Sequence, residues 1–256
     1  MQAVILCGGR GTRLHEETNV RPKPMVSIGD HPILWHIMRH YRSYGVRDFI
    51  LCLGYKGEVI RDYFLNFRHN NADLEVDLAS GDVTLFSKEA VDWRVRLINT
   101  GANALTGTRI RRAAHHIQSD RFFATYGDGV ANVDLDELLR FHRDQGKQVT
   151  VTAVRPPSRF GELLVDGAMV RSFVEKPQTG AGWINGGFFV FERSALDAFS
   201  DREDLSLEGA VLEGMADRGQ LAVYKHDGFW QCMDTYREMQ HLNDLWARGH
   251  IPWAKP

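Results

Sequence analysis

Apolar runs alternate with stretches of helical period through the first half of the chain. Runs rich in β-branched and aromatic side chains predict strands at residues 3–6, 49–53, 122–126 and 149–154. Between these runs, apolar residues recur three or four positions apart over residues 33–41 and 59–64, which predicts amphipathic helices. Strands that alternate with helices are typical of α/β proteins. We therefore expect a mainly parallel sheet flanked by helices.

The pattern changes at three places further along the chain. Residues 73–86 alternate around Ser80-Gly81-Asp82, which predicts a hairpin that serves either as a subunit contact or as a sheet extension. After residue 155 the chain becomes β-rich, and residues 236–248 return to helical spacing. We expect a Rossmann-like single domain over residues 1–256, with a main part at about 1–155, a smaller β-rich lobe on the same sheet at about 156–235, and a C-terminal helix.

The charges of the chain nearly balance, because 31 lysine and arginine residues face 33 aspartate and glutamate residues, for a formal net charge of −2. Nucleic acids and anionic membranes are bound by clustered positive potential, which this balance does not indicate. The chain also lacks the run of about 18 apolar residues that would predict a membrane span. We expect neither nucleic acid nor a membrane as a partner.

The cysteines indicate a reducing compartment. Their number, three, is odd, and Cys7 and Cys52 lie in apolar runs, which favours buried thiols over disulfides. The first residues lead directly into a strand, without the basic and long hydrophobic segments of a secretory signal. We therefore expect a cytoplasmic protein.

A glycine-rich segment, Gly8-Gly9-Arg10-Gly11-Thr12-Arg13-Leu14, follows the first predicted strand. It falls at the carboxyl edge of the sheet, where α/β proteins bind ligands. Glycines let backbone N–H groups approach phosphates, and arginines add charge-assisted hydrogen bonds. A dinucleotide-binding fingerprint would need glycine in place of Leu14, and a P-loop would need Gly-Lys-Ser/Thr. The segment predicts a polyphosphate-binding loop, with a structural turn carrying solvated arginines as the alternative.

A lysine framed by prolines follows, in Arg21-Pro22-Lys23-Pro24-Met25. Proline fixes its own φ and pushes the preceding residue towards an extended conformation. Lys23 is therefore held stiffly, which a solvated surface lysine does not need.

The glycine loop and the framed lysine together resemble the signature of the sugar-1-phosphate nucleotidyltransferase family. Further matches cover essentially the whole chain and include Tyr126-Gly127-Asp128-Gly129, Glu175-Lys176-Pro177, Asn185-Gly186-Gly187-Phe188 and the segment from Trp230 to Thr235. Other segments resemble the cytidylyltransferase branch, which joins CTP to α-D-glucose 1-phosphate and releases pyrophosphate: residues 33–38, 54–57, 106–109, 159–161 and 184–190. The alternatives are an enzyme that uses UTP or dTTP, an enzyme that uses another sugar 1-phosphate, and a non-catalytic module that binds a nucleotide-sugar.

The resemblance implies a role for each motif residue. It makes residues 1–155 the nucleotide-binding part and residues 156–235 the sugar-binding part, and it implies a homo-oligomer. The implied catalytic residues are Arg13, Lys23 and Asp128. The implied nucleotide-binding residues are Leu6, Gly8, Gly9, Arg10, Gly11, Thr12, Arg13, Lys23, Arg109 and Gly127.

The same resemblance implies a magnesium site and a sugar phosphate site. Asp128 and Asp234 would bind Mg²⁺, which prefers one or two carboxylates together with phosphate oxygens and water. The alternative is that each carboxylate caps a turn or a helix. The implied sugar phosphate ligands are Glu175, Lys176, Asn185 and Gly186. His36 and His40 share a predicted helix face without ligand-type neighbours, so we expect a packed or solvated pair.

Overall fold

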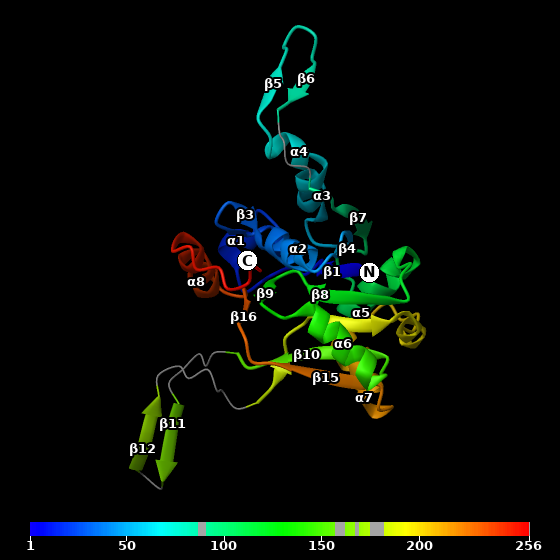
Figure 1. Cartoon of the computed structure of the whole chain (residues 1–256), viewed down its shortest axis with the longest axis vertical. Coiled ribbons are helices and arrows are strands. Elements are labelled where there is room, and N and C mark those ends of the chain that lie inside the picture. Colours follow the sequence, from blue (N-terminus) through cyan, green and yellow to red (C-terminus); the bar gives the residue numbers. More distant parts are fainter. Residues whose placement is uncertain (87–90, 157–161, 167–168, 175–181, 256) are drawn as a thin grey trace.

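A mixed, mainly parallel sheet forms the centre of the molecule (Figure 1), in a computed structural model that describes residues 1–86, 91–156, 162–166, 169–174 and 182–255. Strands β8, β1, β4 and β7 are mutually parallel, whereas β14 runs antiparallel to both β8 and β10. From one edge to the other the strands are β15 (Leu221–His226), β10 (Val149–Val154), β14 (Phe189–Glu192) with β13 (Ile184–Asn185) in line, β8 (Arg121–Tyr126), β1 (Gln2–Cys7), β4 (Asp48–Leu53) and β7 (Arg94–Asn99). The expected α/β fold is confirmed.

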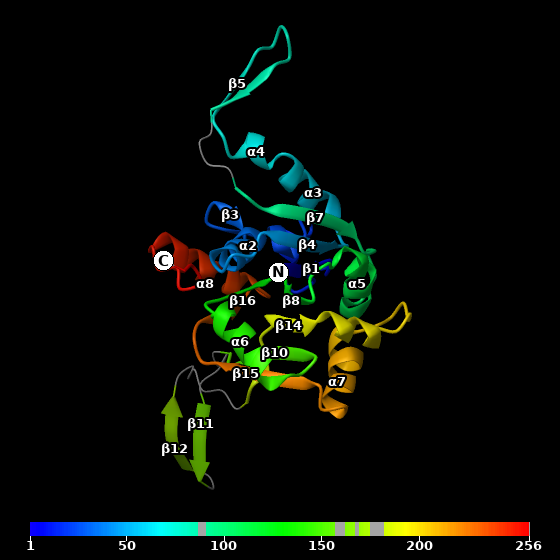
Figure 2. The same cartoon turned by 45° about the vertical axis from the view of Figure 1, so that its right-hand side comes forward.

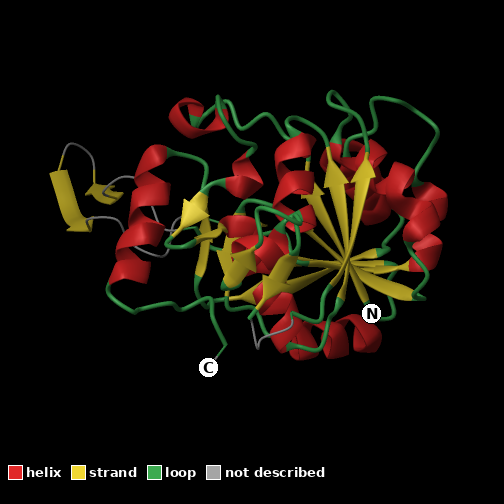
Figure 3. Ribbon diagram, turned by 90° about the horizontal axis from the view of Figure 1, so that it is seen from above, coloured by secondary structure: helices red, strands yellow, loops and turns green. Residues whose placement is uncertain are grey.

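Helices cover both faces of this sheet (Figures 2 and 3). Successive side chains of a strand point to opposite faces of the sheet, so the buried strands present apolar residues on both faces. In β1, Ala3, Ile5 and Cys7 belong to one buried cluster, and Val4 and Leu6 belong to the other. The first cluster receives side chains from α2 (Ile33–Ser43), α3 (Gly57–Leu65), α6 (Leu135–Gln145) and α8 (Tyr236–Ala247). The second receives them from α5 (Thr106–Ala113), the π-helix η4 (Leu207–Leu212) and α7 (Glu213–Asp217).

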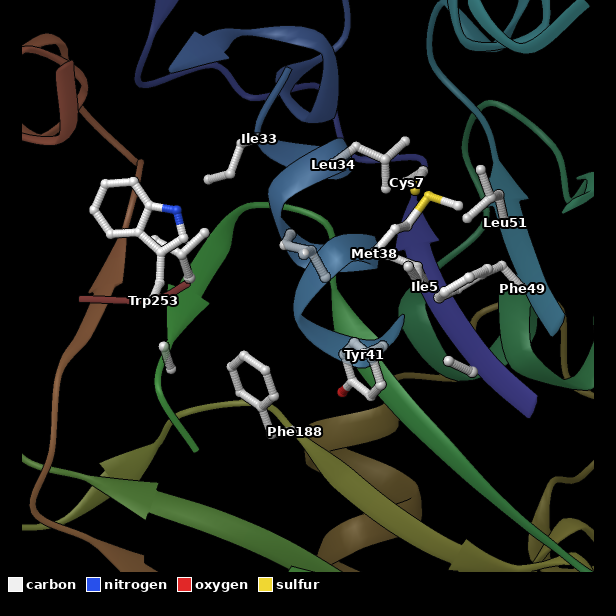
Figure 4. Close-up of a cluster of buried hydrophobic side chains, with 14 of the residues drawn as sticks. Ile5, Cys7, Ile33, Leu34, Met38, Tyr41, Phe49, Leu51, Phe188 and Trp253 are labelled. Carbon is white, nitrogen blue, oxygen red and sulfur yellow. The ribbon is translucent and has the colours of Figure 1, made fainter. Parts of the chain in front are cut away.

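The buried core under α2 is formed by side chains from this helix and from the central sheet. Figure 4 shows Leu34 of this helix beside Cys7, Met38 beside Ile5 and Phe49, and Tyr41 near Phe188, and all of these side chains are buried. The helical spacing that predicted this element therefore places its apolar stripe against the strands.

Two hairpins project from opposite ends of the molecule (Figure 1). The first joins β5 (Leu74–Val76) to β6 (Val83–Leu85), within the segment predicted as a hairpin. Among the described residues these strands pair with each other and not with the central sheet, so the alternative of a sheet extension is wrong. The second joins β11 (Glu162–Asp166) to β12 (Met169–Val174) and lies in the expected β-rich part.

Short elements complete the described chain. Near the sheet edge described below, they are α1 (His15–Thr18), η1 (Lys23–Met25), β2 (Ser27–Ile28), β3 (His31–Pro32), β9 (Gly129–Ala131) and β16 (Trp230–Cys232). The others are α4 (Phe67–Asn70), η2 (Ala114–His116) and η3 (Arg193–Ala198). Within the described ranges, no helix is long and apolar enough to cross a membrane.

Candidate active site

Four loops meet at one edge of the sheet because β1, β4, β7 and β8 are parallel and end side by side. The loops after β1, β7 and β8 line a cavity of about 460 Å³. Its walls also receive residues from η1, from the start of α5 and from the segment around η4. The lining residues are Leu6, Gly8, Gly9, Gly11, Thr12, Arg13, Lys23, Pro24, Ala104, Leu105, Thr106, Arg109, Tyr126, Gly127, Asp128, Ser206, Glu208 and Asp234.

The glycine loop forms one wall of this cavity. Gly11 has a φ of +61°, and a Cβ at that position would lie 2.8 Å from the side chain of Thr18, so glycine is required. The hydroxyl of Thr18 donates to the carbonyl oxygen of Gly11 at 3.1 Å and holds the turn. Nine of the ten residues predicted to bind nucleotide line the cavity. Of those ten described residues, Arg10 does not, and its exposed guanidinium donates to Asn103 Oδ1 at 2.9 Å.

Lys23 lies between two carboxylates at the floor of the cavity. Its Nζ donates to Asp128 Oδ2 at 2.7 Å and also to Asp234 Oδ1. Arg13 NH1 lies 3.0 Å from the other oxygen of Asp234. Burial alone would lower the pKa of Lys23, but the charges and hydrogen bonds of the two carboxylates outweigh it and raise the pKa. The ammonium therefore stays protonated and holds together two acidic residues that would otherwise repel each other.

Backbone pairing explains why these two carboxylates meet. Asp128 follows β8 and precedes β9, which pairs antiparallel with β16, and β16 ends two residues before Asp234. The N–H of Met233 extends this ladder by donating to the carbonyl oxygen of Asp128 at 2.8 Å. Thr235, and not Asp234, is the N-cap of α8, in a capping box with Glu238. The helix-cap alternative for Asp234 is therefore wrong.

Arg109 lies beneath the glycine loop and is almost fully buried, with 4% of its surface exposed. Its guanidinium donates to backbone and hydroxyl oxygens of the loops that follow β1, β4 and β7. Arg109 thus lines the cavity, as expected for a residue that contacts nucleotide. Most of its hydrogen-bond donors, however, already donate to other groups of the protein. Contact of Arg109 with nucleotide stays a prediction.

The match to known proteins agrees with this arrangement. Residues 2–236 match the family model described as nucleotidyl transferase. The chain belongs to this family. It is 46% identical to the glucose-1-phosphate cytidylyltransferase of Salmonella typhi over 254 residues, which cover 99% of this chain and 98% of that protein. It is 30% identical to the mannose-1-phosphate guanylyltransferase catalytic subunit beta of Xenopus tropicalis, covering 90% of this chain and 60% of that protein.

Solved structures share the fold of this nucleotidyl transferase. The crystal structure of HddC from Yersinia pseudotuberculosis superposes with a TM-score of 0.70 at 24% identity, covering 96% of this chain and 99% of that one. At this identity the likeness concerns the fold alone.

One acidic residue of the cavity was not found by sequence reasoning. Glu208 of this nucleotidyl transferase accepts hydrogen bonds from Tyr126 at 2.7 Å and from Thr106 at 2.7 Å, and Ser206 donates to it at 3.0 Å. Burial would raise the pKa of Glu208, but these hydrogen bonds outweigh it and lower the pKa. The cavity therefore contains a third carboxylate, away from the Lys23 cluster. Glu208 lies in an ordinary acidic stretch, and no motif marked it.

The predicted sugar phosphate residues lie partly within the described chain. Asn185 is exposed and donates to the hydroxyl of Tyr126 at 3.0 Å, which connects it to the cavity wall. Gly186 is buried, and a Cβ there would lie 2.6 Å from the side chain of Val154. Glu175 and Lys176 lie outside the described residues.

Proposed function

We propose that this nucleotidyl transferase transfers the cytidylyl group of CTP to α-D-glucose 1-phosphate, giving CDP-glucose and pyrophosphate. The observation that carries the proposal is 46% identity to the Salmonella typhi cytidylyltransferase along nearly the full length of both chains. The guanylyltransferase relative is more distant, at 30% identity, and this chain spans only 60% of its length. The cavity supports the same reaction, since it contains both a phosphate-binding type of loop and an acidic pair.

A divalent cation fits this acidic pair. Asp128 and Asp234 lie on either side of one ammonium group, so their carboxylates converge on a single point. Magnesium prefers one or two carboxylates with phosphate oxygens and water completing its shell, whereas zinc prefers histidine and cysteine. We therefore propose Mg²⁺ as the cofactor, held by these two residues. When bound, it would neutralise charge on the reacting phosphates.

The remaining charges of the cavity suit an in-line displacement. The glycine loop offers backbone N–H groups to the triphosphate, and Arg13 at its end would bind the departing pyrophosphate. Lys23 would leave the carboxylates and approach the α-phosphate, where negative charge increases as the bond to the leaving group breaks. Glucose 1-phosphate would attack from the side of Asn185 and Gly186, with Glu175 and Lys176 as further ligands. No covalent enzyme intermediate is needed.

A matrix of nucleotides and sugar phosphates tests this function. CTP, UTP, dTTP and GTP are each combined with glucose, mannose and galactose 1-phosphate, and pyrophosphate release is measured with and without the sugar phosphate. We expect release only when the sugar phosphate is present, and fastest with CTP and glucose 1-phosphate. Nucleotide binding without turnover in any combination would instead support the non-catalytic module.

We also propose that the chain forms a homo-oligomer in the cytoplasm. The projecting hairpin exposes Val76, Leu78 and Phe86, and apolar side chains of this kind are usually covered in an assembly. All three cysteines are free thiols, which suits a reducing compartment. Light scattering of the purified protein tests the assembly, and a monomeric mass would contradict it.

A further inference from the structure

The guanidinium of Arg109 occupies space that side chains would otherwise fill at two positions of the sheet edge. A Cβ added to Gly8 would lie 2.1 Å from Arg109 Cζ, and a Cβ added to Gly54 would lie 2.4 Å from Arg109 NH1. Non-bonded atoms do not approach so closely, so Gly8 requires glycine while Arg109 is in place. At Gly54 a Cβ would also lie 2.8 Å from the Cα of Gly8, so that position requires glycine in any case. Gly8 begins the glycine loop, and Gly54 follows β4.

Hydrogen bonds from the same group join three strand ends. Arg109 NH2 donates to the carbonyl oxygen of Gly8 at 2.9 Å, after β1. Arg109 NH1 donates to the carbonyl oxygen of Leu53 at 3.1 Å, at the end of β4, and to Thr100 Oγ1 at 2.8 Å, after β7. Gly101 accepts a further bond at 2.8 Å. One side chain from α5 thereby fixes the relative positions of the loops after β1, β4 and β7.

The charge of Arg109 is balanced by these oxygens and not by an acid. Among the described residues, no carboxylate forms an ion pair with Arg109, whereas Arg111 and Arg112 of the same helix both pair with Glu203 at the surface. A buried cation needs several well-placed acceptors to offset its lost hydration. Removing one acceptor should therefore loosen the group and the loops that it joins.

We propose that Arg109 is a positioning residue that holds the glycine loop in its nucleotide-binding shape, and that Gly8 is a glycine to make room for it. The inference rests on the proposed function, because it assumes that the loop binds the nucleotide. It differs from a direct contact between Arg109 and nucleotide, since it predicts an effect from Thr100, which does not line the cavity.

Thr100 offers the first test, because it is fully buried and does not line the cavity. Thr100→Val keeps the shape of the side chain but removes the oxygen that accepts from Arg109, and Thr100→Ser keeps that oxygen. Calorimetric titration should show CTP binding weakened by about tenfold in the valine variant, the scale of one hydrogen bond to a charged group, and unchanged in the serine variant. The Michaelis constant for glucose 1-phosphate should stay the same in both. Equal CTP affinity in all three proteins would overturn the proposal.

A double-mutant cycle offers the second test. The three atoms nearest to a Cβ at Gly8 all belong to Arg109, so truncating the arginine should remove the clash. Gly8→Ala and Arg109→Ala should each weaken CTP binding, and the double variant should bind no more weakly than Arg109→Ala alone. Losses that simply add would contradict the proposal. If the wild-type protein binds another nucleotide in place of CTP, the same variants are compared with that nucleotide. Failure to bind CTP, UTP, dTTP and GTP alike would refute the proposed function and this inference with it.

Discussion

The ammonium of Lys23 lies 2.7 Å from the carboxylate of Asp128, although 105 positions separate the two residues in the chain. The prolines on either side of Lys23 fix the direction from which it approaches, and the β9–β16 ladder adds Asp234 to the same cluster. In this arrangement a lysine occupies the place between two carboxylates that suits a divalent cation. The proposed metal and the lysine therefore compete for the same oxygens, and the next two predictions concern this cluster.

Replacing Asp128 by asparagine keeps an acceptor for Lys23 but removes the negative charge. If Asp128 binds Mg²⁺, turnover should fall by about a hundredfold or more, the scale of losing one preorganised electrostatic group. Asp144→Asn, an exposed change on α6, serves as the matched control and should retain normal turnover. Steady-state kinetics at saturating Mg²⁺ measure both variants, and near-normal turnover in Asp128→Asn would reject the assignment.

Removing the ammonium should strengthen metal binding in the absence of nucleotide. In Lys23→Met the two carboxylates lose their internal cation, so Mn²⁺ used as a probe should bind at least about fivefold more tightly, in keeping with the loss of an interaction of about 1 kcal/mol or more. Electron paramagnetic resonance measures the free Mn²⁺ directly, without turnover. Lys225→Met on the distant strand β15 should bind Mn²⁺ like the wild type. Weaker binding by Lys23→Met would mean that the lysine organises the metal site and does not compete with the metal.

Two buried histidines predict how stability depends on pH. Burial lowers the pKa of His36 and of His40 to about 4, and Nε2 of each ring donates to a backbone carbonyl oxygen. Their pKa in the unfolded chain is about 6.5, so the unfolded state binds more protons between pH 6.5 and 4. The free energy of unfolding should therefore decrease as the pH falls through that window, by up to about 1.4 kcal/mol per pH unit for each histidine.

The variant His36→Gln isolates one of these contributions. It removes one titrating group, so urea unfolding should show a smaller dependence of stability on pH between 6.5 and 4 than the wild type does. A pH dependence unchanged by the substitution would mean that His36 titrates in the folded protein as it does in the unfolded chain.

The sequence predicted the buried strands better than the edge strands. Strands β1, β4, β8 and β10 begin and end within one residue of their apolar runs, because strands covered on both faces read as continuous hydrophobic segments. Strand β7 was not predicted. It lies at the sheet edge and carries Arg94 and Arg96, which bridge to Asp48 on the neighbouring strand, so its polar content resembled a loop.

For the site, features set by neighbouring residues could be predicted from the sequence, and contacts between distant segments could not. Motif residues such as Gly11 and Lys23 could be predicted, because local backbone chemistry determines their conformation. The environment of Arg109 could not, since nothing in the local sequence distinguishes Arg109 from Arg111 and Arg112. Only tertiary packing separates the buried one from the two at the surface. Glu208 meets Tyr126 across 82 residues of sequence, and no local pattern encodes that contact.

The central claim is tested most directly by comparing kcat/KM for CTP, UTP and dTTP with glucose 1-phosphate as the second substrate. Cytosine presents an amino donor where uracil and thymine present a carbonyl acceptor, so a buried acceptor in the base site would be left unpaired with the latter two. Such a loss costs about 1 to 3 kcal/mol, which corresponds to roughly five- to a hundredfold in specificity. We expect kcat/KM for CTP to exceed that for UTP and dTTP by at least about tenfold. Equal or greater kcat/KM with UTP or dTTP would contradict the cytidylyltransferase assignment.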